Sequence, residues 1–135
     1  MLFEDFFLIN MQHSVLLCLG SNHEAEPHIM AALGRLSEIL DDLRRSSLMP
    51  TAPVGMTGPL FLNCAAIGTT ALTHDTLLAQ IKTIERELGR MPGEKAARRI
   101  AIDIDLLRYD DTICHTDDWK RPYIRPLLTE LGIRV

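Results

Sequence analysis

The chain has 135 residues, of which 47% are hydrophobic and 24% are charged, and its formal net charge at pH 7 is −4. This length and composition predict a single domain over residues 1–135 with an ordinary hydrophobic core. We expect no nucleic-acid binding, because the chain is acidic, and no membrane insertion, because no apolar stretch approaches the length of a transmembrane helix.

Residues 1–12 are predicted to be an N-terminal extension. The sequence MLFEDFFLIN is apolar but short, and it carries acidic residues where a secretory signal peptide carries basic ones. We expect the protein to be a monomer, or a weak homodimer that associates through this apolar N-terminus.

The cysteines and histidines show no pattern of a disulfide framework or of a metal site. Cys18, Cys64 and Cys114 are odd in number and lack C-x-x-C spacing, and the first two lie in apolar runs. Buried, reduced thiols are therefore expected, which fits a cytoplasmic protein. The five histidines, His115 among them, follow no ligand spacing, and we expect them at structural or surface positions.

The first half of the chain predicts a strand, a helix and a second strand. Residues 15–19 form a continuous apolar run that is typical of a buried strand. Apolar residues recur with the 3.6-residue period of a helix over 27–43. A short strand is expected at 46–51. The loop that follows, 52–59, is rich in glycine and proline and long enough to contact a ligand.

The second half predicts a strand, a helix and a last strand. The third strand is expected over 60–70 and the second helix over 74–88, with Thr73 as its N-cap residue. A charged loop follows over 90–99, and the last strand covers 100–109. The resulting order, β-α-β-β-α-β, predicts an α+β fold of the ferredoxin-like type, a four-stranded antiparallel sheet with the helices packed on one face.

The most informative feature is the pair Asp103 and Asp105 within the run IAIDIDL. Period-two alternation places the isoleucines on one face of the last strand and both aspartates on the other, with their Cα atoms roughly 6.6 Å apart. Neighbouring carboxylates repel each other and are costly to bury, whereas Mg²⁺ prefers carboxylate oxygens as ligands. A metal site and a solvated strand face that binds nothing are equally consistent with this pair alone.

Basic residues gather in the stretch before this strand. They are Arg86, Arg90, Lys95, Arg98 and Arg99. On an acidic chain, such a cluster suits a small anionic ligand such as a nucleotide phosphate. The alternative is a solvated helix end followed by a charged loop.

These motifs, taken in order, resemble those of one enzyme family. The chain reads LGSN at 19–22, TAPVG at 51–55 and PLFLN at 59–63. Glu85 and the pair Gly89-Arg90 follow, and IDIDLL at 102–107 comes last. In this order and spacing, residues 15–111 resemble the 6-hydroxymethyl-7,8-dihydropterin pyrophosphokinases of folate biosynthesis.

The resemblance implies an ATP-dependent transferase that moves pyrophosphate from Mg-ATP to the hydroxymethyl group of 6-hydroxymethyl-7,8-dihydropterin. It implies that Asp103 and Asp105 hold two Mg²⁺ ions on the ATP phosphates. It also implies that the ring of Phe61 stacks on the pterin and that the amide of Asn63 hydrogen-bonds the pterin edge. The loop residues that correspond to positions around the pterin are Thr51 and Val54.

The resemblance also implies a nucleotide site. The residues that it places around the nucleotide and its phosphates are Glu85, Arg90, Arg98, Arg99 and Arg121. The chain departs from the family pattern in this half. A tryptophan before the aspartate strand is absent, Pro92 replaces an arginine, and both the loop after that strand and the C-terminal segment 112–135 are shortened. These departures leave an alternative open, a catalytically impaired relative that binds a pterin or a nucleotide without transfer.

Overall fold

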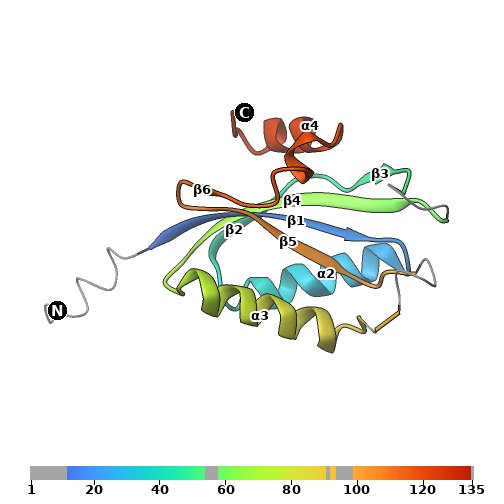
Figure 1. The fold of residues 1–135 in the computed structure, drawn as a ribbon, viewed down its shortest axis with the longest axis horizontal. Helices are drawn as coiled ribbons and strands as arrows, with labels where there is room; N and C mark the ends of the chain where they lie inside the picture. Colours follow the sequence, from blue (N-terminus) through green and yellow to red (C-terminus); the bar gives the residue numbers. More distant parts are fainter. Residues whose placement is uncertain (1–11, 54–57, 91, 94–98, 135) are drawn as a thin grey trace, which may run out of the picture.

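The computed structural model describes residues 12–53, 58–90, 92–93 and 99–134. Val54, Lys95, Arg98 and nearly all of the predicted N-terminal extension lie outside these residues. The described residues form an α+β structure in which one antiparallel sheet packs against three α-helices (Figure 1). Among them, no helix is both long and apolar enough to cross a bilayer.

The elements follow one another as β1 (His13–Ser21), α2 (Ala25–Leu36), β2 (Asp41–Arg45), β3 (Met49–Thr51), β4 (Phe61–Thr70), α3 (His74–Glu87), β5 (Asp103–Tyr109), β6 (Thr112–Ile113), the 3-10 helix η1 (Asp118–Lys120) and α4 (Ile124–Glu130). The strand order in the sheet is β2-β4-β1-β5-β6, and β3 also pairs with β4. All of these pairs are antiparallel. β1 therefore lies in the centre of the sheet, between β4 and β5.

The first helix is shorter than its sequence period predicts. The period extends over 27–43, but α2 ends at Leu36, and Asp41–Arg45 pair with β4 as β2. Leu40 continues the helical period in the sequence, yet it lies buried in the turn that leads into this strand. Pairing with the sheet outweighs local periodicity here, because helix propensity is a weak preference that tertiary contacts override.

The described sheet has six strands, whereas the sequence predicts four. Part of the predicted strand 46–51 forms β3, and Ser46, which directly follows β2, also hydrogen-bonds to β4. The Ser46 amide donates to the carbonyl of Ala65 at 2.9 Å, and its hydroxyl accepts from the amide of Ala65 at 2.9 Å. The two strands that the sequence did not predict are β2, most of which falls in the predicted helix, and β6, which forms a hairpin with β5 after the turn at Asp110.

Each face of the sheet packs against its own helices. Along β1, Val15 and Leu17 belong to the core that α2 and α3 cover, whereas Leu16 and Cys18 belong to the core that α4 covers. The prediction of helices on one face therefore holds for α2 and α3, but α4 and η1 lie on the opposite face (Figure 1). Because α4 has 7 residues, it covers only part of that face.

The three thiols differ in accessibility, which predicts their reactivity. Cys18 and Cys64 are buried and free, and burial raises the pKa of both, that of Cys64 to about 11. Cys114 is only half-buried. Because the thiolate is the reactive form, we expect Ellman's reagent at about pH 8 to titrate one thiol in the native protein and all three in guanidinium chloride. Native Cys114→Ser should titrate none, and a second fast-reacting thiol would contradict the prediction.

Candidate active site

A cavity of about 160 Å³ lies on the α4 side of the sheet. The residues that line it are Cys18, Gly20, Thr51, Ala52, Phe61, Asn63, Ile100, Asp103, Asp105, Asp118, Arg121 and Tyr123. They come from β1, β3, β4 and β5, from the segments next to these strands, and from the segment that contains η1. The structure thus brings six of the predicted site residues to one cavity, namely Thr51, Phe61, Asn63, Asp103, Asp105 and Arg121.

Alternation along β5 directs the two aspartates into the cavity. Ile104 and Leu106 are buried in the core that α2 and α3 cover. Because successive side chains of a strand point to opposite faces, Asp103 and Asp105 face the other side, where they line the cavity. The predicted placement of both carboxylates on one strand face is confirmed.

Gly20 on β1 leaves room for the side chains of the neighbouring strand. It pairs with Asn63 of β4 on one side and with Asp103 of β5 on the other. A Cβ atom at this position would lie 3.0 Å from Asn63 Oδ1 and 3.7 Å from Phe61 Cδ1. Asn63 is buried, and its Nδ2 donates a hydrogen bond to Thr51 Oγ1 at 2.6 Å. The missing side chain at Gly20 therefore allows this linked pair and the ring of Phe61 to share the cavity.

Three carboxylates, those of Asp103, Asp105 and Asp118, line the same cavity. Burial, followed by the negative charges of Asp103 and Asp118, raises the pKa of Asp105 to about 7. A divalent cation relieves such repulsion, and Mg²⁺ takes carboxylate oxygens as ligands. The donor set of the cavity therefore fits Mg²⁺.

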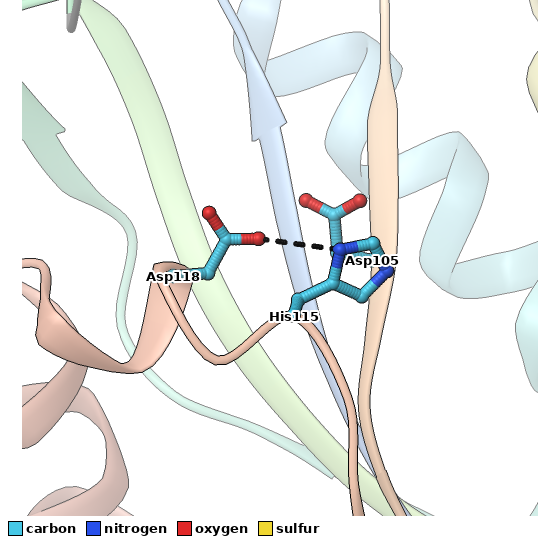
Figure 2. A group of neighbouring side chains, drawn as sticks. All are labelled: Asp105, His115 and Asp118. Atoms are coloured by element: carbon cyan, nitrogen blue, oxygen red, sulfur yellow. Dashed lines mark ion pairs between the residues drawn. The ribbon is translucent and has the colours of Figure 1, made fainter.

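His115 also belongs to this cluster, a placement that the sequence did not predict. Its ring is exposed, but Figure 2 shows it beside Asp105 and Asp118, and ligand atoms of the three residues all lie within 4.8 Å of one another. His115 Nδ1 lies 3.7 Å from Asp118 Oδ2, and Asp118 Oδ1 accepts a hydrogen bond from Arg121 Nε at 3.1 Å. The Arg121 guanidinium and the His115 ring thus stand next to the carboxylates.

Trp119 holds the segment that carries His115 and Asp118 against β5. Its indole Nε1 donates to the carbonyl oxygen of Leu107 at 3.2 Å and to that of Cys114 at 3.0 Å. Leu107 belongs to β5, so the indole links this strand directly to the segment. The loop geometry near Asp105 is therefore set by a contact between residues 12 positions apart in the chain.

Sequence analysis also missed Cys18, Asp118 and Tyr123 as lining residues. Cys18 lies in an apolar run and gives no signal of a site. Asp118 and Tyr123 stand in the segment HTDDWKRPY, whose only signal is its density of polar and aromatic side chains. Burial raises the pKa of the Tyr123 phenol, so this side chain is neutral at physiological pH.

The residues predicted around the nucleotide lie in several places. Arg90 follows α3, and its Nη1 donates to Asp103 Oδ1 at 2.6 Å and to Glu85 Oε2 at 3.1 Å. Glu85 itself is buried. Arg99 is exposed, and within the described part of the chain it does not line the cavity. Arg98 lies outside the described residues.

Comparison with known proteins decides the family. The family model of 7,8-dihydro-6-hydroxymethylpterin-pyrophosphokinase (HPPK) matches residues 16–132. The chain belongs to this family. The HPPK match includes all the cavity-lining residues, and it continues past residue 111 through η1 and α4.

Individual relatives agree with the HPPK assignment. The mitochondrial folate synthesis bifunctional protein of Arabidopsis thaliana is 35% identical over 136 aligned residues, which cover 92% of this chain and 24% of that protein. The corresponding protein of Pisum sativum is 34% identical, with 90% and 26% covered. The 2-amino-4-hydroxy-6-hydroxymethyldihydropteridine pyrophosphokinase of Aquifex aeolicus is 34% identical, with 82% and 69% covered. This HPPK chain thus spans about a quarter of the length of the two plant relatives.

Proposed function

We propose that the protein transfers the terminal pyrophosphoryl group of Mg-ATP to the hydroxymethyl group of 6-hydroxymethyl-7,8-dihydropterin. The observation that carries this proposal is one cavity in which aromatic and amide side chains lie beside three carboxylates. The first group suits a planar heterocycle, and the second suits a metal-bound polyphosphate. Membership of the HPPK family supports both halves of the proposal.

The proposed pterin side of the cavity consists of Phe61, Tyr123, Asn63 and Thr51. The two rings offer apolar surface on which a planar ligand stacks. An amide presents both donor and acceptor groups, so Asn63 suits the edge of a pterin. Its bond to the Thr51 hydroxyl fixes the amide orientation before a ligand arrives. Val54, outside the described residues, belongs to this side in the proposal.

Asp103 and Asp105 are the residues proposed to hold two Mg²⁺ ions. When bound, Mg²⁺ supplies neutralisation of the charge on the ATP phosphates. A second hollow is lined by His115, Thr116, Asp117, Asp118 and Arg121, and the last two of these also line the cavity. We propose that this hollow receives phosphate oxygens, because the imidazole and guanidinium N–H groups donate charge-assisted hydrogen bonds to such oxygens.

Three arginines complete the proposed nucleotide site, and Glu85 contributes to it through one of them. Arg90 approaches the carboxylates from the side of Asp103, to which it donates a hydrogen bond. Arg98 and Arg99 stand between α3 and β5 in the sequence, and we propose that they contribute to the same site. Glu85 lies behind Arg90. Phosphoryl-type transfer requires positioning and charge neutralisation rather than a covalent nucleophile, which a cluster of arginines and metal-binding carboxylates supplies.

We also propose a ferredoxin-like core, a cytoplasmic location and a single domain. The order β2-β4-β1-β5, with α2 and α3 on one face, agrees with a ferredoxin-like core to which β3, β6 and α4 are added. Free cysteines agree with a reducing compartment such as the cytoplasm. We further propose one domain over residues 1–135, present as a monomer or a weak homodimer.

Release of AMP tests the proposed function. The full chain with ATP, Mg²⁺ and the hydroxymethyl pterin should form AMP, and omission of the pterin should reduce AMP to the level of the blank. No AMP with all three present would reject pyrophosphoryl transfer. Calorimetry then separates the remaining possibilities. Binding of the pterin or the nucleotide without turnover would support the alternative, a catalytically impaired relative. Pro92 and the shortened loop favour this alternative. Absence of both binding and turnover would reject both functions.

Replacement of Gly20 by alanine should weaken pterin binding while the fold remains intact. The added Cβ would lie 3.0 Å from Asn63 Oδ1, so the amide that reads the pterin edge must move. We expect the KM for the pterin to rise about tenfold, which corresponds to about 1.4 kcal/mol, and the KM for ATP to stay unchanged.

Gly34→Ala is the matched control for this prediction. Gly34 lies in α2, and apart from the backbone of its own helix no atom of the described residues lies within 4 Å of an added Cβ there. Alanine in a helix interior costs no stability relative to glycine. Both KM values should stay at wild-type levels in this control, and equal pterin KM values in the two variants would contradict the role of Gly20.

A further inference from the structure

Glu85 is a carboxylate that the fold buries between α3 and β5. Its side chain is 3% exposed, and it projects from the last turn of α3. A buried charge requires compensating partners. Oε2 accepts hydrogen bonds from the Ile104 amide at 2.9 Å and from Arg90 Nη1 at 3.1 Å, and Oε1 lies 3.3 Å from Lys82 Nζ. Both oxygens are therefore engaged by the protein itself.

These partners connect Glu85 to Asp103 by two routes. Arg90 Nη1, which donates to Glu85, also donates to Asp103 Oδ1 at 2.6 Å. The second route is the backbone, because Ile104 lies between Asp103 and Asp105 on β5. Glu85 thus fixes both the strand backbone between the two aspartates and the guanidinium that holds one of them.

We propose that Glu85 is a positioning residue for the carboxylates of the cavity, acting through Arg90 on Asp103 and without contact to nucleotide or metal. The inference rests on the proposed function in so far as the ion is taken to be Mg²⁺. Carboxylates that ligate metals are themselves held by hydrogen bonds from outer groups, and the loss of such a group weakens metal binding about 10–100-fold. The small exposed area of Glu85 leaves no surface for a ligand.

The substitution Glu85→Gln separates positioning from a merely structural role. The glutamine oxygen can still accept from the Ile104 amide, whereas the charge that holds Arg90 is lost. Mn²⁺ serves as the probe for the site, because it binds carboxylate oxygens as Mg²⁺ does and its free form is measured by electron paramagnetic resonance. We expect Mn²⁺ affinity to fall about tenfold or more without any substrate present, and pterin affinity to stay unchanged.

Glu87→Gln is the matched control, since Glu87 lies on the same helix but is exposed and pairs with Arg35. It should bind Mn²⁺ with wild-type affinity. The single variant Arg90→Gln and the double variant Glu85→Gln/Arg90→Gln complete a double-mutant cycle. If Glu85 acts through Arg90, all three variants should lose Mn²⁺ affinity to within about threefold of one another. The double variant carries the test should Glu85→Gln alone fail to fold.

Two results would overturn the inference. One is wild-type Mn²⁺ affinity in Glu85→Gln or, where that protein does not fold, in the double variant. The other is a double variant whose loss of Mn²⁺ affinity equals the product of the losses in the two single variants. In active protein the Mg²⁺ concentration for half-maximal AMP formation should rise in Glu85→Gln while the KM for the pterin stays constant. A wild-type protein that forms no AMP rejects the proposed function alone, because the Mn²⁺ measurements need no turnover.

Discussion

Replacement of Asp105 by asparagine is expected to reduce AMP formation about a thousandfold or more while the protein stays folded. Asparagine offers one neutral oxygen where the proposed metal site needs a charged carboxylate. Loss of metal-based charge neutralisation costs several kcal/mol in the transition state, and each 1.36 kcal/mol corresponds to about a factor of ten in rate. Asp103→Asn should have a similar effect. Initial rates of AMP release at saturating substrates and Mg²⁺ measure both.

The same substitution should raise the melting temperature of the metal-free protein. Burial and the charges of Asp103 and Asp118 raise the pKa of Asp105 to about 7, so its ionised form is disfavoured in the folded state. A carboxyl group whose folded pKa is raised lowers stability as the pH rises from the unfolded value near 4 towards 7. In EDTA, the gain from Asp105→Asn should therefore be larger at about pH 8 than at about pH 4.

Asp111→Asn is the control for both effects. Asp111 is exposed in the hairpin turn after β5, away from the cavity lining. The same chemical change there should alter neither AMP formation nor the melting temperature by more than a small amount. An Asp105→Asn protein with wild-type turnover would remove the aspartate pair from the proposed mechanism. One that melts lower than wild type in EDTA at high pH would contradict the electrostatic argument.

The side chains that face the cavity from strands were predictable because a strand has a period of two. Once Ile104 is assigned to the hydrophobic core, Asp103 and Asp105 must face the opposite side, and a register shift would reverse the whole strand. The same argument places Phe61 and Asn63 on one face of β4. These four residues come from two different strands, and the antiparallel register through Gly20 sets them side by side.

The remaining part of the site depends on contacts that no local pattern contains. His115 and Asp118 reach Asp105 because the Trp119 indole bonds a carbonyl on β5, and a segment without periodicity gives no sign of that contact. The predicted end of the first helix was wrong for a related reason. Leu40 satisfies the helical period and is also buried beside the sheet, so the pattern could not separate the two outcomes. Periodicity assigns a side chain to a face, whereas distant contacts decide where an irregular segment lies.

Phe61→Ala is expected to raise the KM for the pterin about 10–100-fold and to leave the KM for ATP close to wild type. Stacking of an aromatic side chain on a planar base contributes about 1–3 kcal/mol, which corresponds to this range. Phe61 is only half-buried at the start of β4, so its truncation should cost little stability. Steady-state kinetics with each substrate varied in turn, together with thermal unfolding, measure these quantities.

Leu60→Ala shows whether the effect belongs to the ring or to the strand end. Leu60 is the neighbour of Phe61, the residue is 62% exposed, and it is not part of the described cavity lining. A general disturbance at the start of β4 would change both variants alike. A specific stacking role predicts a raised pterin KM in Phe61→Ala alone and its recovery in Phe61→Tyr, which keeps an aromatic face. A pterin KM that remains at the wild-type value in Phe61→Ala would mean that the pterin does not stack on Phe61. The proposal that one cavity binds both the pterin and the metal-bound phosphates would then be wrong.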